Sequence, residues 1–153
     1  MKTVLGILVF LIAVAAGADA NECCRPCDPP SPGDPAGRIA CAQRAVQSVG
    51  FTRPESIRLC AAAWSEAPAL CAARAYRVPF SKEELIDLCR RALTDGPAAC
   101  AEVAYRGLLA KEDILILCRR HGRIEHAQCA VQALKNGYSR EEALSLCKAT
   151  RLF

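Results

Sequence analysis

Cysteine is the residue best able to do chemistry in this chain, and its spacing is regular. The 153 residues contain 11 cysteines, and eight of them recur as pairs about 29 residues apart. These pairs are Cys41 and Cys60, Cys71 and Cys89, Cys100 and Cys118, and Cys129 and Cys147. Disulfides persist in proteins outside the reducing cytosol. The pattern predicts a disulfide-pinned repeat protein.

Three further cysteines, Cys23, Cys24 and Cys27, precede the repeats and cannot all pair among themselves. Cys24 and Cys27 have the C-x-x-C spacing of redox proteins, whose chemistry needs a thiolate stabilised at a helix start. Here the motif lies in Pro-rich chain. We therefore favour one local bridge and one spare thiol, which could link two chains into a disulfide-linked dimer.

A zinc site is the second chemistry that the spacing allows. Cys118, His121, His126 and Cys129 are four ligand types that suit zinc, within 12 residues. Both cysteines, however, occupy positions that recur in repeats without histidine, and a zinc site would break two of the paired bridges. We favour two surface histidines and predict no metal and no cofactor.

Paired carboxylates are the third possibility, because acids from successive repeats could converge as in a glycosidase. The candidates are Glu83, Glu84, Glu112, Asp113, Glu141 and Glu142. Most of them fall in the first turn of a predicted helix, where an acid is favoured by the helix dipole. The sequence contains no G-x-S-x-G elbow and no Gly-rich phosphate loop. We predict no catalytic residues and a protein that is not an enzyme.

The elements that position the paired cysteines are short helices. Each first cysteine begins a Cys-Ala-x-x-Ala stripe, as in Cys41-Ala42-x-x-Ala45, which places small residues on one helical face. A turn and a second run ending in the second cysteine follow. The predicted fold is all-α, with four disulfide-stapled helical hairpins of about 29 residues stacked as a short α-solenoid of eight helices.

Helix-start signals support these hairpins. A hydroxyl residue is followed three positions later by glutamate in three repeats, which predicts a capping box: Thr52 and Glu55, Ser81 and Glu84, Ser139 and Glu142. The third repeat has Ala110 instead, so the start of its second helix should be less stable by about 1 kcal/mol. Pro68 and Pro97 are expected to open first helices.

Two disulfide pairings remain open from the sequence. Cys41 and Cys60 lie at similar distances from the turn between them, so a bridge within each hairpin joins residues at one height. The rival pairing joins successive repeats, as in Cys60 with Cys71, but it leaves Cys41 and Cys147 without partners. We favour the pairing within hairpins.

The amino end has the order of a secretory signal. A basic residue, an apolar run and an Ala-x-Ala site predict a signal peptide over 1–20. The apolar run, from Val4 to Ala16, is too short for a stable membrane span. A Cys/Pro-rich arm over 21–37 and a repeat domain over 38–153 should follow. The predicted location is secreted, either extracellular or periplasmic.

The charge balance is mildly basic, with 20 Lys and Arg against 16 Asp and Glu. In three repeats, basic residues follow the second cysteine and would collect along one side of a stacked array. This basic edge, a candidate anion-binding site, consists of Arg90, Arg91, Arg119, Arg120, Arg123, Lys148 and Arg151. No aromatic residues alternate with it as they do in proteins that stack bases, so we expect no nucleic acid partner.

These features favour an exported structural or interaction module whose partner is a protein or an anionic extracellular or envelope ligand. Its construction is similar to that of cysteine-rich relatives of tetratricopeptide arrays, whose repeats are longer. The alternatives are a small secreted hydrolase that uses the clustered acids and a membrane-active helical toxin. The helices of a toxin should have a wide Leu/Phe face and a lysine-rich opposite face, whereas these helices carry alanine stripes.

Overall fold

Eight helices form the regular structure of the protein. The computed structural model describes residues 34–119 and 122–148, and no strand occurs within these ranges. The helices are α1 (Pro35–Val49), α2 (Arg53–Cys60), α3 (Ala67–Ala75), α4 (Lys82–Cys89), α5 (Gly96–Arg106), α6 (Lys111–Cys118), α7 (Ile124–Lys135) and α8 (Arg140–Cys147). None of these helices is long and apolar enough to cross a membrane.

Successive helices pair into four hairpins, and one disulfide joins the two helices of each. The bridges are Cys41–Cys60, Cys71–Cys89, Cys100–Cys118 and Cys129–Cys147, with Cα–Cα distances of 5.5 to 5.8 Å. The expected all-α fold of four disulfide-stapled hairpins is confirmed. The pairing between successive repeats does not occur in the structure.

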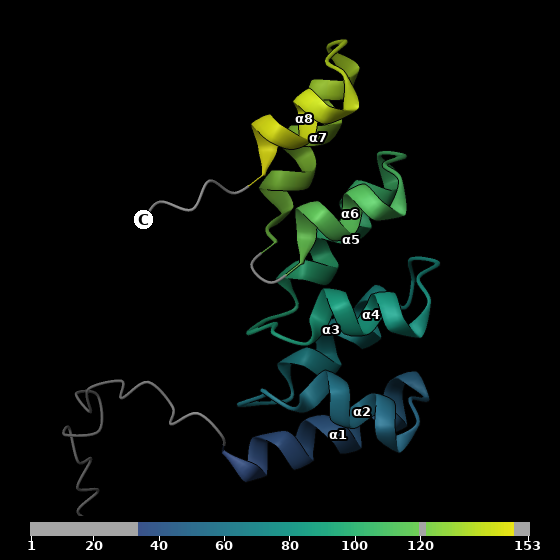
Figure 1. Cartoon of the computed structure of the whole chain (residues 1–153), viewed down its shortest axis with the longest axis vertical. Coiled ribbons are helices and arrows are strands. Elements are labelled where there is room, and N and C mark those ends of the chain that lie inside the picture. The colour runs from purple at the N-terminus through teal and green to yellow at the C-terminus, as the bar shows by residue number, and fades with distance from the viewer. Residues whose placement is uncertain (1–33, 120–121, 149–153) are drawn as a thin grey trace, which may run out of the picture.

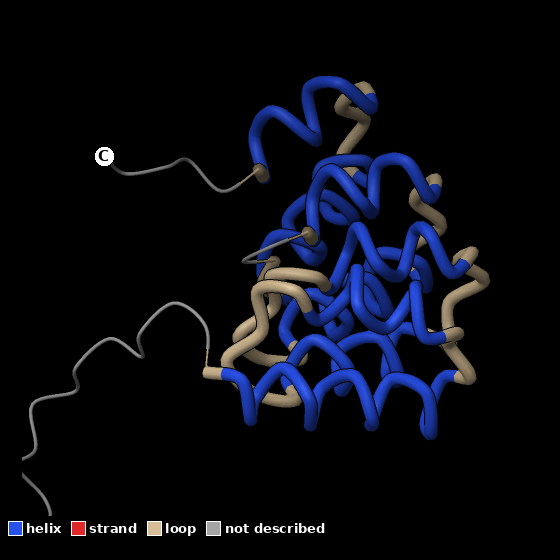
Figure 2. Tube along the Cα trace, turned by 60° about the horizontal axis from the view of Figure 1, so that its bottom comes forward, coloured by secondary structure: helices blue, strands red, loops and turns tan. Residues whose placement is uncertain are grey.

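The hairpins stack in chain order along the long axis of the molecule (Figure 1). First helices pack on first helices and second helices on second helices, which makes two layers. Within the described ranges, each hairpin contacts only the hairpins before and after it in the chain. The turns inside the hairpins lie on one side of the array and the linkers between hairpins on the other (Figure 2). This arrangement is that of a short solenoid.

Alanine is the residue that lets the first helices approach one another. The alanine four residues after the first cysteine is buried in every hairpin, at Ala45, Ala75, Ala104 and Ala133. The second helices contribute larger side chains to the same core, among them Leu59, Leu88 and Leu117. Short helices are marginally stable alone, so this packing and the bridges together hold the array.

The first helix begins three residues before the expected boundary at 38. Asp34 caps α1, because its Oδ1 accepts a hydrogen bond from the Ala36 amide at 3.1 Å. Pro35 takes the first helical position, where its missing N–H has no intrahelical role. The proline that suggested an extended arm therefore starts a helix. Pro68 and Pro97 lie in the first turns of α3 and α5, as expected.

The second helices begin with the expected caps, with one informative exception. The Ser81 and Ser139 amides donate to Glu84 at 2.6 Å and to Glu142 at 2.8 Å, and the Thr52 amide donates to Glu55 at 2.6 Å. No side-chain cap is present at Ala110, where α6 begins.

Asp113 stands in α6 where the other second helices have their capping glutamate, but it pairs with the next hairpin instead. It is 4 % exposed, and its Oδ2 forms an ion pair with Arg140 Nε of α8 at 2.6 Å. Its Oδ1 has no hydrogen-bond partner within the described residues. The third and fourth hairpins are thus joined by a nearly buried carboxylate.

Candidate functional site

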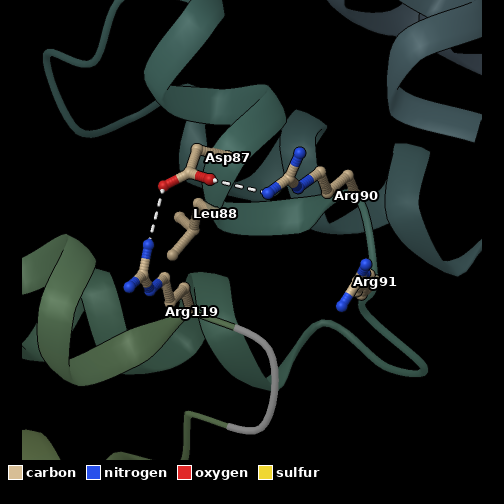
Figure 3. A pocket seen from close by; sticks show the side chains of 5 residues that line it. All are labelled: Asp87, Leu88, Arg90, Arg91 and Arg119. Atoms are coloured by element: carbon tan, nitrogen blue, oxygen red, sulfur yellow. Dashed lines mark ion pairs between the residues drawn. The ribbon is translucent and has the colours of Figure 1, made fainter.

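The basic edge expected from the sequence is only partly assembled. Arg90, Arg91 and Arg119 line one small pocket with Asp87 and Leu88. Figure 3 shows Asp87 between two guanidinium groups: it lies 3.4 Å from Arg90 and 3.5 Å from Arg119. Arg91 makes no ion pair with it. One carboxylate therefore offsets part of the positive charge of this cluster.

The other members of the basic edge are spread out or lie outside the described residues. Arg123 precedes α7 and lines a different groove, together with Arg74, Leu93 and Ile124. Lys148 follows α8 and is exposed. Arg120 and Arg151 fall outside the described residues. The structure thus brings together three of the seven predicted side chains.

Asp87 is the residue that the sequence reasoning missed at this edge. Its signal is the spacing of three residues between Asp87 and Arg90, because residues three apart on a helix are neighbours. The contact with Arg119 depends on stacking, since Arg119 stands one repeat after Arg90. The sequence signal therefore covers the pair with Arg90 but not the pair with Arg119.

A second set of basic residues, also missed, lies at the turn end of the first helices. Arg77, Arg106 and Lys135 each stand six residues after the first cysteine of their hairpin. All three are exposed, and none forms an ion pair within the described residues. We call these three residues the turn row. They lie at or just after the ends of α3, α5 and α7, and the turns that follow these helices lie on the side of the array away from the linkers (Figure 1).

Apolar and aromatic side chains accompany the turn row. Tyr76 and Tyr105 directly precede two of its members and are exposed. A groove between α5 and α7 has Arg106 and Lys135 at its rim, and its other lining residues include Val103, Leu108 and Val131. Gln128 and Gln132 add amide groups to the same groove. The groove can therefore accept an apolar side chain next to a negative charge.

The acids that could have formed a paired-carboxylate site are mostly engaged elsewhere. Glu84 and Glu142 cap helices, Asp113 pairs with Arg140, and Glu83 Oε1 accepts from Arg58 Nη1 at 2.7 Å. Glu112 and Glu141 are exposed in the first turns of α6 and α8. These contacts favour structural roles for the acids.

The residues of the possible zinc site are used differently. Cys118 and Cys129 form disulfides with Cys100 and Cys147, and a bridged sulfur is no thiolate ligand. His126 Nδ1 accepts from the Arg123 amide at 3.4 Å. Within 34–119 and 122–148, no group of three or more His, Cys, Asp or Glu could hold a metal ion. His121 and the cysteines at 23, 24 and 27 lie outside the described residues.

No protein family, curated protein or solved structure matches the chain significantly.

The caps predict how stability depends on pH. Hydrogen bonds from the Thr52 and Ser139 backbones lower the pKa of Glu55 and of Glu142, and the Arg58 guanidinium lowers the pKa of Glu83. A lowered folded-state pKa means that the unfolded chain binds protons more readily. The contribution of these groups is thus complete above the ordinary value of 4.5 and is lost as the pH falls through the folded-state values.

We therefore expect the melting temperature to change little between pH 7 and 5 and to decline below about pH 4.5. Thermal melts followed by circular dichroism at several pH values measure this dependence. The double variant Glu55→Gln and Glu142→Gln should show a smaller decline, because its amides cannot be protonated in this range. Equal declines in the variant and the parent would show that the caps do not control acid stability.

Proposed function

We propose that the protein is an exported interaction module that binds an acidic protein segment through the turn row, and that it is not an enzyme. The observation that supports this function is the repetition of Arg77, Arg106 and Lys135 on one side of the stacked array. Their exposed charges are not offset by ion pairs within the described residues. Such a row attracts and orients an anionic partner.

The surroundings of the row favour a protein over a simple anion. The exposed Tyr76 and Tyr105 resemble the aromatic side chains that are enriched at protein interfaces. The groove between α5 and α7 adds Val103, Leu108 and Val131 as an apolar contact. A peptide that alternates acidic and apolar side chains would use both features.

Export is part of the same proposal. Four disulfides are typical of proteins that work in an oxidising compartment. The signal peptide predicted over 1–20 would direct the chain there. Each bridge holds the two helices of one hairpin together, and the packing of one hairpin on the next sets the spacing of the turn row.

The test is capture of partners from the native extracellular or periplasmic fraction with the oxidised protein, followed by binding measurements on the captured partner. Substituting Arg77, Arg106 and Lys135 by alanine should weaken binding by about 10-fold, or about 1.4 kcal/mol. Binding to the parent should also weaken between low and physiological salt, because exposed charges are screened.

A matched control removes the same charge from the basic edge. The triple variant Arg90→Ala, Arg91→Ala and Arg119→Ala also loses three positive charges, but two of these arginines share Asp87. We expect it to bind nearly as well as the parent. A stronger loss in this control than in the turn-row variant would assign binding to the basic edge instead.

A further inference from the structure

Lys82 shows how one hairpin attaches to the next. From the first position of α4, its Nζ reaches back to hairpin 1 (α1 and α2), where it donates to the Gly50 carbonyl at 2.7 Å. It also lies 5.8 Å from the centre of the Phe51 ring and 3.4 Å from Glu55. A carbonyl, an aromatic ring and a carboxylate thus form a socket for a cation.

The last hairpin (α7 and α8) carries the same socket residues at its outer end. Gly137, Tyr138 and Glu142 match Gly50, Phe51 and Glu55 in type and spacing. In hairpin 1 the next hairpin covers the aromatic residue, so that Phe51 is 2 % exposed. Within the described residues no hairpin covers the outer face of the last one, and Tyr138 is 51 % exposed.

The first hairpin carries the matching cation at its own outer end. Arg53 occupies the first position of α2, as Lys82 does in α4 and Arg140 does in α8. The side chains of Lys82 and Arg140 both pair with an acid of the preceding hairpin. Arg53 is exposed, because no hairpin precedes α1 in the part of the chain that the structure describes.

Apolar side chains on the two outer faces are also exposed where their counterparts inside the array are buried. Ile57 is 63 % exposed, whereas Ile86, at the same position of the second hairpin, is 3 % exposed. At the other end, Leu146 is 64 % exposed, whereas its counterparts Leu59, Leu88 and Leu117 are at most 4 % exposed. One outer face therefore lacks a preceding hairpin and the other lacks a following one.

We propose that the protein associates with itself head to tail, with the first hairpin of one copy stacking on the last hairpin of another. Arg53 of the copy that contributes its first hairpin would occupy the socket of Gly137, Tyr138 and Glu142 in the other copy. Ile57 of the same first hairpin would cover Leu146. The contact repeats the junction between hairpins inside the chain. Ile39 on α1 is bulkier than the buried Ala69, Ala98 and Ala127 at its position, so the copies stand slightly further apart there.

This contact joins two different surfaces, so it leaves a free face at each end of every oligomer and allows open chains to grow. Sedimentation or light scattering on the oxidised protein should show an average mass that rises above the monomer between micromolar and millimolar concentration. The variants Ile57→Lys and Leu146→Lys should each stay monomeric with an unchanged helical spectrum, because both residues are exposed in the single chain.

Mixing the two variants gives the decisive result. Ile57→Lys retains an intact last hairpin and Leu146→Lys retains an intact first hairpin, so an equimolar mixture should form dimers and nothing larger. Adding Arg53→Glu to the Leu146→Lys chain should abolish these dimers. A parent that is monomeric at every concentration, or a mixture that stays monomeric, would overturn the proposal. So would oligomers that persist in SDS without reductant, because these are covalently linked.

Discussion

Reducing the four disulfides is expected to unfold most of the array at room temperature. Each bridge closes a loop of 18 or 19 residues, and a loop of this size contributes about 3 kcal/mol by restricting the unfolded chain. The combined effect is comparable with the whole stability of a typical domain, about 5 to 15 kcal/mol. The second helices have only eight residues each, too few to persist alone.

Circular dichroism at 222 nm with and without a phosphine reductant measures this loss. A large fall in the helical signal is the expected outcome. Replacing one bridge at a time then separates the hairpins. The variant without Cys71 and Cys89 should lose more stability than the variant without Cys129 and Cys147, because the last hairpin has a neighbour on one side only. A reduced protein that keeps its helical signal and its cooperative melt would show that packing alone is sufficient.

Replacing Arg140 by alanine should lower the free energy of unfolding by more than most surface substitutions, whose effects usually stay within about 0.5 kcal/mol. The substitution removes the partner of Asp113 Oδ2, and Asp113 is 4 % exposed. Its Oδ1 already has no hydrogen-bond partner within the described residues, so both oxygens of a nearly buried carboxylate would be left without one. Chemical denaturation of the oxidised protein gives the free energy of unfolding.

Lys111→Ala is the matched control for this prediction. Lys111 occupies the same first helical position in α6, but it forms no ion pair within the described residues. Its removal should change the free energy of unfolding by less than about 0.5 kcal/mol. Similar effects of the two substitutions would mean that Asp113 is solvated well enough without Arg140. The variant Arg140→Lys should recover part of the loss, since an ammonium can approach one carboxylate oxygen.

The hairpins could be predicted because their signals are local. Cysteine spacing, the Cys-Ala-x-x-Ala stripe and the caps at Ser81 and Ser139 all act within one repeat. Local propensity and packing agreed at these positions, so the order and type of the helices were correct. The start of α1 was missed because Pro35 can either end a regular element or begin one, and only the Asp34 cap distinguishes the two.

The surface was harder to predict because its contacts cross between repeats. The sequence shows that basic residues recur, but it does not show that Asp87 lies between Arg90 and Arg119. Asp113 was expected in a helix-capping region, and its pairing with Arg140 depends on the packing of the next hairpin. The turn row was readable from the repeat alignment, but its exposure required the packing of the first helices.

The placement of each bridge inside its own hairpin also affects the order in which the chain can be oxidised. Eight cysteines allow 105 pairings, yet every cysteine of the array bonds to an adjacent one along the sequence. If the chain enters an oxidising compartment amino end first, each bridge can close once its own hairpin has emerged. No bridge has to wait for a distant segment, so maturation can proceed vectorially, one hairpin at a time.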